Sequence, residues 1–308
     1  MSAFSDSDVK MVCENLVPTV PQEPQTIQRS YTQQISAMMA QLLSMRFILS
    51  LPSLLLVCMF SKLAAAMSTP SSTPTKKTAA LVFMHGLGDT PAGWSSLATV
   101  LPQLQPCLSS VEYVFPAAPT LPISINGGMR MSSWFDIYDW PISVGIQDDP
   151  VNKLKAVDQM EAVIAKLEQE KGIPRTRIVV GGFSQGGAIA LLTAFYSSST
   201  TDRPARPPLA GCVSLSGWLT LTDTLVPTLP KNNIATPLFW AHGKYDDKVL
   251  FEHQAAGIQQ LKQRGLQNIQ AHDYPMGHES HPDEMQALAN FLKRVLFSND
   301  KEEEKDEL

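Results

Sequence analysis

The chain has 308 residues, of which 44% are hydrophobic, and a formal net charge of −5. This length and apolar content support one globular domain with a substantial core. Lysines and arginines form no cluster larger than short pairs such as Lys76-Lys77, so the sequence lacks the basic surface that nucleic-acid binding requires. There are four cysteines, and only Cys107 and Cys212 fall within the expected domain, which argues against a disulfide framework.

Three segments precede the domain. Residues 1–44 are polar, with scattered Pro and Gln, and are predicted to be a disordered extension. After Met45-Arg46, a mainly apolar run over 47–60 leads to Ala64-Ala65-Ala66, which is the pattern of a signal peptide with a small-residue cleavage site. This segment, 45–66, is too short for a comfortable membrane span. Residues 67–75 are interpreted as a linker.

Apolar runs and helical periodicities alternate over residues 76–298. Strands are expected at 79–84, 111–115, 177–180, 209–215, 237–241 and 269–274, and helices at 149–172, 185–197, 251–264 and 283–297. This alternation predicts an α/β fold in which a mostly parallel sheet has helices on both faces.

The stretch Gly182-Phe183-Ser184-Gln185-Gly186 lies between an expected strand and an expected helix. A strand, a sharp turn with glycines on both sides and a helix are the parts of a nucleophile elbow. The glycines are needed because the strained turn has no room for a Cβ on either side of the serine. Ser184 is therefore the candidate nucleophile.

A serine hydroxyl needs a base to take its proton and an acid to orient that base, in the chain order Ser, Asp or Glu, His on this kind of sheet. The strand at 237–241 runs into a polar turn that holds Asp246 and Asp247, and either could be the acid. The strand at 269–274 is followed by His278, which stands where the base is expected. His281 is its nearest rival, although it directly precedes a proline and the last helix.

Two other histidines, His253 and His272, lie inside a helical pattern and a strand and are interpreted as structural. His278, Glu279 and His281 could suggest a metal site. No H-E-x-x-H or paired-cysteine motif supports that interpretation, so we expect no metal and no cofactor.

A tetrahedral intermediate also needs hydrogen-bond donors for its oxyanion. The first strand ends at His85-Gly86-Leu87-Gly88-Asp89, a loop in the position that supplies one such donor in this arrangement. The backbone N–H groups of Leu87 and Gln185 are the expected pair.

The expected domain resembles the acyl-protein thioesterases, which belong to the phospholipase and carboxylesterase group of α/β-hydrolases. The resemblance covers roughly residues 76–298 and rests on five blocks in the family's order: 85–90, 133–137, 181–187, His242-Gly243 with Asp246, and Gly277-His278. It implies that Ser184, Asp246 and His278 form the catalytic triad, because the family's acid stands four residues after the His of the His-Gly pair. It implies Leu87 and Gln185 as oxyanion donors. One departure is Asp247-Lys248, where the family often has a proline.

An irregular, apolar, glycine-containing stretch lies between the second strand and the long helix. Such a stretch is typical of a lid or a ligand wall, which makes Leu121, Ile123, Trp134 and Phe135 candidate substrate-binding residues. The alternative is that Trp134 and Phe135 fill the core. The resemblance implies that this region helps to hold a fatty acyl chain.

The expected function is that of a serine hydrolase that cleaves acyl thioesters or esters, with S-acylated (palmitoylated) proteins or small lipid esters as substrates. A general carboxylesterase or a lysophospholipase would use the same machinery. The alternative from another class is an inactive acyl-binding or interaction protein on the same fold.

The tail at 299–308 ends in Lys305-Asp306-Glu307-Leu308, an ER-retention address, unless it is only a solvated acidic tail. Together with the signal-like segment, it predicts an enzyme of the ER lumen with an ER-retention receptor as a partner. If translation starts at Met67 instead, the chain carries no signal and the enzyme is cytoplasmic.

Overall fold

The computed structural model describes residues 77–145, 147–196, 206–222, 229 and 231–298. The predictions for the extension at 1–44, the signal-like segment at 45–66, the linker at 67–75 and the tail at 299–308 lie outside the described residues.

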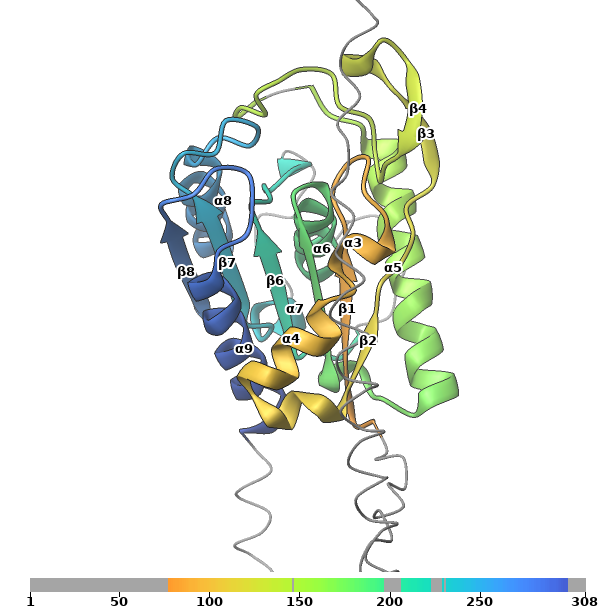
Figure 1. The fold of residues 1–308 in the computed structure, drawn as a ribbon, viewed down its shortest axis with the longest axis vertical. Coiled ribbons are helices and arrows are strands. Elements are labelled where there is room, and N and C mark those ends of the chain that lie inside the picture. The colour runs from red at the N-terminus through yellow and green to blue at the C-terminus, as the bar shows by residue number, and fades with distance from the viewer. Residues whose placement is uncertain (1–76, 146, 197–205, 223–228, 230, 299–308) are drawn as a thin grey trace, which may run out of the picture. The chain divides into compact units, whose positions relative to one another are not determined.

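A central sheet of parallel strands in the order β2-β1-β5-β6-β7-β8 organises the domain (Figure 1). Its strands are β1 (Ala79–Met84), β2 (Val111–Val114), β5 (Ile178–Phe183), β6 (Gly211–Leu215), β7 (Leu238–Gly243) and β8 (Ile269–Tyr274). Every pairing in this sheet is parallel. The predicted parallel α/β sheet is confirmed.

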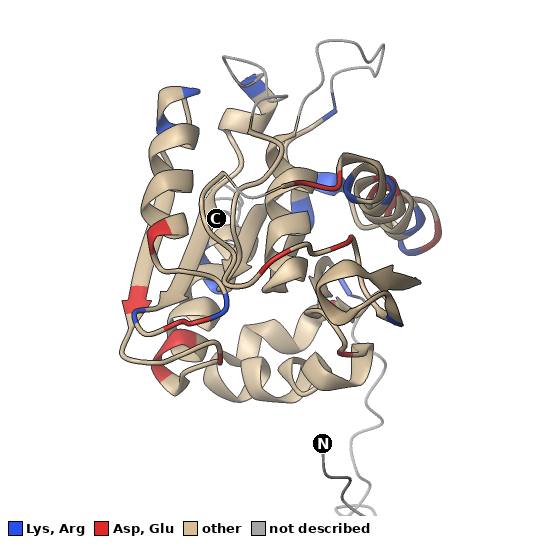
Figure 2. Cartoon of the chain, turned by 90° about the horizontal axis from the view of Figure 1, so that it is seen from above, with Lys and Arg blue, Asp and Glu red and all other residues tan. Residues whose placement is uncertain are grey.

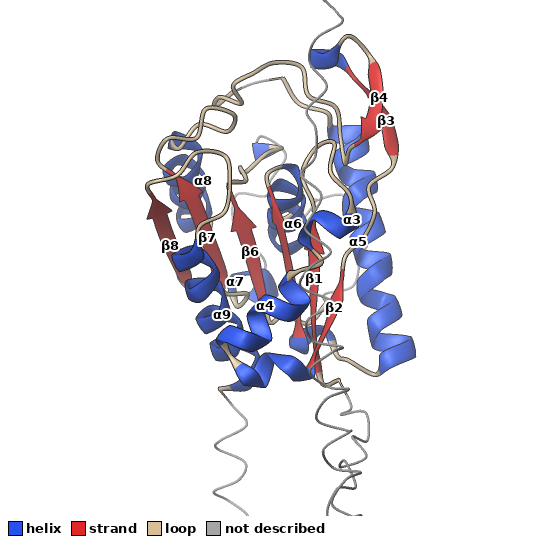
Figure 3. Ribbon diagram, viewed as in Figure 1, coloured by secondary structure: helices blue, strands red, loops and turns tan. Residues whose placement is uncertain are grey.

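Helices cover both faces of the sheet (Figure 3). The described helices are α3 (Pro91–Trp94), α4 (Leu97–Leu104), α5 (Pro150–Lys171), α6 (Gln185–Phe195), α7 (Lys231–Ile234), α8 (Glu252–Gln263) and α9 (Pro282–Phe297), with 3₁₀ turns η1 (Pro106–Ser110), η2 (Ser124–Asn126) and η3 (Arg175–Arg177). Helices α3, α4 and α7 were not predicted from the sequence, because α3 and α7 have only four residues and α4 contains Pro102. No helix in the described part of the chain is long and apolar enough to cross a bilayer.

Strand β1 shows how the two faces are built. Ala80, Val82 and Met84 point into a core shared with α5, α6 and α8. The alternate residues of β1 point into a second core, shared with α4 and α9. Because successive side chains of a strand face opposite sides, a strand covered on both faces must be apolar at every position, as this one is.

The stretch predicted to be an irregular lid is more regular than expected. Strands β3 (Thr120–Ile123) and β4 (Met129–Ser132) pair antiparallel around η2 and form a hairpin beside the main sheet (Figure 1). Gly127 and Gly128 both have positive φ, at 65° and 81°, and provide the tight return between the strands. The glycines that suggested an irregular loop are therefore the turn of a hairpin.

Helix α9 begins with a reciprocal cap. The ring of His281 accepts a hydrogen bond from the Asp283 N–H at 3.2 Å, and Glu284 Oε2 accepts one from the His281 N–H at 3.4 Å. Glu284 is fully buried, and its Oε1 has no hydrogen-bond partner among the described residues. Burial raises the pKa of the Glu284 carboxyl to about 8, against the opposing effect of the His281 N–H.

We expect Glu284→Gln to stabilise the domain at pH 8 and to leave its stability unchanged at pH 4. A carboxyl whose pKa is raised in the folded state binds more protons folded than unfolded, so stability falls as the pH rises from the unfolded pKa to about 8. Glutamine keeps an oxygen for the His281 N–H and cannot ionise. Thermal unfolding of both proteins at several pH values measures the effect. Equal melting temperatures at pH 8 would contradict it.

Candidate active site

The predicted site residues follow the carboxyl ends of several strands, at one edge of the sheet. From β1 the strand order runs through β2 on one side and through β5 to β8 on the other, so it reverses between β1 and β5. Ligands of open α/β sheets bind at such a reversal. The loop 85–89 follows β1 and Ser184 follows β5, so both lie at this point. Seen from above, onto the strand ends, the loops carry both acidic and basic residues (Figure 2).

Ser184 occupies a strained turn between β5 and α6. Its φ is 55° and its ψ is −120°, which a residue other than glycine rarely adopts. A Cβ on Gly182 would lie 2.3 Å from the backbone of Gly186, and one on Gly186 would lie 2.2 Å from the carbonyl oxygen of Met84. The steric reason given for the two glycines is therefore found in the structure.

We expect Gly186→Ala to destabilise the domain by about 3 kcal/mol or more, because the added methyl group would overlap backbone atoms that cannot move aside cheaply. Gly277→Ala is the matched control, since it is also next to a predicted site residue but a Cβ there meets only the Tyr245 oxygen at 3.9 Å. The free energy of unfolding of both variants, measured with denaturant, tests this expectation. Similar losses of stability in the two would show that crowding at Gly186 does not cause the destabilisation.

Ser184, His278 and Asp246 form one hydrogen-bonded series. The Nε2 atom of His278 lies 2.9 Å from Ser184 Oγ, and its Nδ1 lies 2.7 Å from Asp246 Oδ2. The ring of Phe183 packs on the His278 imidazole with a centroid distance of 4.7 Å. These three side chains come from the ends of β5, β7 and β8, so only the folded sheet brings them together.

The two aspartates that the residue pattern left as alternatives are in different environments. The Asp246 side chain is fully buried, whereas that of Asp247 is 76% exposed and lies 3.3 Å from the Lys248 ammonium. Asp246 Oδ1 accepts the N–H groups of Lys248 and Val249, both at 2.9 Å. The turn therefore points Asp246 toward His278 and Asp247 into solvent.

The contacts of the Asp246 carboxyl also keep it ionised. Burial raises the pKa of its carboxyl, but hydrogen bonds from His242 and His278, the charge of His278 and the Val249 N–H together hold that pKa well below its usual range. His242 is buried and places its Nε2 3.4 Å from Asp246 Oδ2 and 2.8 Å from the Val249 oxygen. The His242-Gly243 motif in the sequence did not predict this contact between His242 and Asp246.

The remaining histidines have other partners. His281 caps α9 and stacks on Tyr274. His272 stacks on Phe239, with ring centroids 5.0 Å apart. His253 is buried and bonds the carbonyl oxygen of Ile142 at 3.0 Å, and burial lowers its pKa. Within the described ranges, no group of three His, Cys, Asp or Glu side chains is placed to hold a metal ion.

The two predicted oxyanion donors lie beside the nucleophile. Leu87 lines the same cavity as Ser184. Gln185 is the first residue of α6, and the first N–H groups of a helix have no partner within it. The Gln185 side chain, to which the sequence analysis gave no role, is fully buried and bonds the segment 133–135.

A cavity of about 650 Å³ opens at Ser184. Apart from Leu87, its apolar walls come from Trp94, Trp140 and Phe183, and its polar lining includes His278, Asp89, Lys248 and Glu279. Trp94 and Trp140 were missed by the sequence analysis. Their positions in the sequence could have indicated this role. Trp94 follows the predicted oxyanion loop at 85–89, Trp140 follows the predicted ligand wall, and neither lies in an expected strand.

The four predicted substrate-binding residues do not line this cavity. Ile123, Trp134 and Phe135 are buried in the core, and Leu121 is half-buried in the β3–β4 hairpin. Trp134 donates its indole N–H to the His85 oxygen at 2.8 Å, and the Phe135 ring packs against Lys153 and Trp218. The alternative interpretation, in which Trp134 and Phe135 fill the core, describes their positions. Both rings pack in the core because the chain, which is partly exposed along β4, becomes buried from Ser133 to Phe135.

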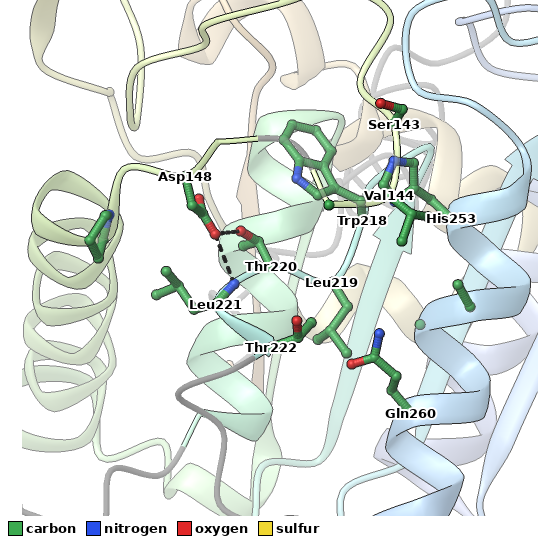
Figure 4. A pocket seen from close by; sticks show the side chains of 14 residues that line it. Ser143, Val144, Asp148, Trp218, Leu219, Thr220, Leu221, Thr222, His253 and Gln260 are labelled. Carbon is green, nitrogen blue, oxygen red and sulfur yellow. Dashed lines mark hydrogen bonds between the residues drawn. The ribbon is translucent and has the colours of Figure 1, made fainter.

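A second cavity, of about 330 Å³, lies between residues 143–145 and 148–150, the segment at 218–222 and α8 (Figure 4). Asp148 accepts hydrogen bonds there from the Thr220 hydroxyl and from the Leu221 N–H, the latter at 3.0 Å. Lys153 pairs with Asp148 and is buried, and this burial lowers the pKa of its ammonium well below its ordinary value. The two cavities share no lining residue.

Comparisons with known proteins agree with this fold. The model of the phospholipase/carboxylesterase family matches residues 68–296. Acyl-protein thioesterase 1 of Mycosarcoma maydis is 39% identical over 232 residues, which cover 72% of this chain and 92% of the relative.

Two solved plant structures are similar over almost their whole length. Acyl-protein thioesterase 2 of Zea mays is 31% identical with a TM-score of 0.63, covering 72% of this chain and 96% of its own. SOBER1 of Arabidopsis thaliana is 30% identical with a TM-score of 0.61, covering 71% of this chain and 99% of its own. The chain therefore belongs to the phospholipase/carboxylesterase family of α/β-hydrolases and is a hydrolase of thioesters or esters.

Proposed function

We propose that this hydrolase cleaves S-acyl thioesters of proteins, with a palmitoyl-type chain as the acyl group, through an acyl-enzyme on Ser184. The observation that carries the proposal is the series from Ser184 through His278 to Asp246, which opens into a cavity with aromatic and aliphatic walls. The similarity to acyl-protein thioesterases supports the choice of thioester over ester.

In the first half of the reaction, His278 takes the Ser184 proton while the Oγ atom attacks the acyl carbonyl carbon. The N–H groups of Leu87 and Gln185 stabilise the oxyanion. His278 then gives its proton to the departing thiolate sulfur, which leaves as a free thiol. Asp246 stays ionised, holds the proton of His278 on Nδ1 and stabilises the imidazolium that forms.

In the second half, a water molecule gives a proton to His278 and attacks the acyl carbon. A second oxyanion collapses, the fatty acid leaves, and the Ser184 hydroxyl regains its proton from His278. The net reaction adds one water to the thioester and yields a thiol and a carboxylic acid.

An assay of three matched substrates tests the substrate class. We expect the highest kcat/KM for an S-palmitoyl peptide, a lower value for the same peptide with an O-palmitoyl serine, and a lower value still for its S-acetyl form. A preference for lysophosphatidylcholine would favour the lysophospholipase alternative. Acyl binding without turnover would favour an inactive binding protein.

The ends of the chain support a proposal about location. We place the enzyme in the ER lumen, because the apolar run after Met45-Arg46 and the terminal Lys305-Asp306-Glu307-Leu308 each require the secretory pathway. S-acylated cysteines of most membrane-attached proteins face the cytosol, so a lumenal enzyme would act on lipid esters rather than on S-acylated proteins. The location of the enzyme therefore decides between these two substrate classes in the cell.

Deleting the last four residues should cause secretion of a form cleaved near Ala66. Fractionation of cells that carry the tagged full-length and tail-deleted proteins measures this. A cytosolic pool that the deletion leaves unchanged would instead support translation from Met67 and cytoplasmic protein deacylation.

A further inference from the structure

One segment, 132–135, connects the two proposed oxyanion donors, Leu87 and Gln185, and is buried from Ser133 to Phe135. On the side of Leu87, the N–H of Gly88 donates to the Ser132 oxygen at 2.8 Å, and the Trp134 indole N–H donates to the His85 oxygen at 2.8 Å. The segment 132–135 is therefore fixed to the loop that follows β1.

On the other side, the segment is held by the Gln185 side chain. Gln185 Oε1 accepts the backbone N–H of Trp134 at 3.2 Å, and its Nε2 donates to the Phe135 oxygen at 2.8 Å. Gln185, Trp134 and His85 are each 1% exposed or less, so water cannot replace a bond that is lost. Segment 132–135 thus connects the two donors through hydrogen bonds. The bonds of Trp134 and Gln185 are buried, whereas the bond between Gly88 and Ser132 lies nearer the surface.

The direction of the Leu87 N–H follows from contacts to the preceding carbonyl. The Gly86 oxygen lies 2.8 Å from Nδ1 of His85 and accepts the Asp89 N–H at 3.3 Å. The Nε2 atom of His85 accepts the Ala118 N–H at 3.3 Å, so the ring proton is on Nδ1 and is donated to Gly86. The peptide between Gly86 and Leu87 is trans, so its N–H points opposite to its C=O. The hydrogen bonds that hold the Gly86 carbonyl therefore also set the direction of the Leu87 N–H.

We propose that Trp134 and Gln185, through their side chains, are positioning residues that set the spacing and aim of the two oxyanion donors. This inference rests on the proposed function, because it takes Leu87 and Gln185 as the donors. Hydrogen-bond donors that are already in place stabilise the transition state without having to move. If a donor is displaced slightly, part of this stabilisation is lost. The indole N–H is the most testable contact, since it can be removed while the aromatic bulk is largely kept.

The experiment compares Trp134→Phe with Trp240→Phe in the full chain. Trp240 is also fully buried, but its indole nitrogen has no hydrogen-bond partner in the described part of the chain. Both variants lose one indole N–H and a similar volume. Only Trp134→Phe loses a bond to the loop that holds Leu87.

Removing one oxyanion donor costs 10²–10³ in rate, so misaiming one donor should cost about tenfold. We expect Trp134→Phe to lower kcat about tenfold with KM nearly unchanged, and Trp240→Phe to leave kcat within about twofold of the parent. The rate at which a fluorophosphonate labels Ser184 should fall by the same factor, because its phosphoryl oxygen also needs the donors. Equal kcat and labelling rates in the two variants, whatever their melting temperatures, would overturn the proposal.

If Trp134→Phe does not fold, Gln185→Met is the alternative test variant. It keeps the backbone N–H of residue 185 and removes the side-chain hydrogen bonds to segment 132–135. The same fall in labelling rate is expected, and an unchanged rate would overturn the proposal. Labelling does not depend on the natural acyl substrate. A parent enzyme that is labelled but cleaves no acyl thioester would therefore defeat the proposed function and leave the positioning inference intact.

Discussion

Replacing Ser184 by alanine is expected to lower kcat for acyl-thioester hydrolysis on the order of 10⁴-fold or more, with the fold unchanged. The variant removes the proposed nucleophile, the Oγ at 2.9 Å from His278 Nε2. Residual activity would come from the oxyanion donors and substrate binding alone. Steady-state kinetics on an S-acyl peptide and labelling by a fluorophosphonate measure the two consequences.

Ser216 offers a matched control within the same domain. It directly follows β6 as Ser184 follows β5, it has a φ of 48°, and its buried hydroxyl has no hydrogen-bond partner among the described residues. Ser216→Ala should leave kcat within about twofold of the parent, because it removes a hydroxyl that bonds nothing. If Ser184→Ala is still labelled, or if both variants lose activity alike, Ser184 is not the nucleophile.

Asp246→Asn is expected to lower kcat by about 10⁴-fold, because an amide in place of the carboxylate favours the wrong tautomer of His278 and cannot stabilise the imidazolium. The carboxylate is suited to that role, since its hydrogen bonds hold its pKa well below the usual range and keep it charged at neutral pH. The loss should appear in kcat with little change in KM, since Asp246 does not line the cavity at Ser184.

Asp247→Asn is the neighbouring control. Its side chain is 76% exposed and its ion pair with Lys248 is on the surface, so the substitution should change kcat by less than about twofold. Circular dichroism and thermal unfolding of both variants separate a catalytic effect from a folding effect. Comparable losses in the two would mean that the orienting acid lies elsewhere.

Much of the fold was predictable because it depends on local patterns. The apolar run at 79–84 and the alternating run at 269–274 became β1 and β8 with the expected bounds, and the helix expected at 149–172 is α5, Pro150–Lys171. Asp149 caps this helix through the Asn152 N–H, and Gly172, with a φ of 65°, ends it. The hairpin formed by β3 and β4 was not predicted, because its strands are only four residues long and their stability comes from pairing with each other.

Some residues of the candidate site could likewise be identified from local sequence patterns, and others could not. Ser184 and the glycines around it could be identified from the sequence, because the steric demand of the elbow acts within five consecutive residues. The resemblance to a family favoured Asp246 over Asp247, but residue type alone did not separate them. What separates them physically is the turn after β7, whose N–H groups draw the Asp246 carboxylate inward.

The sequence by itself determined most of the strands and helices of the main domain, the candidate nucleophile and the chemistry of its candidate partners, since these depend on residue type and short spacing. The tertiary structure alone decided which apolar side chains line the cavity at Ser184. Trp134 and Phe135 were expected in a ligand wall, yet they are buried beneath the loops, while Trp94 and Trp140 line the cavity. Tryptophan and phenylalanine suit a core and a ligand pocket equally well, and only the path of the chain after β4 and after β1 places each ring on one side or the other.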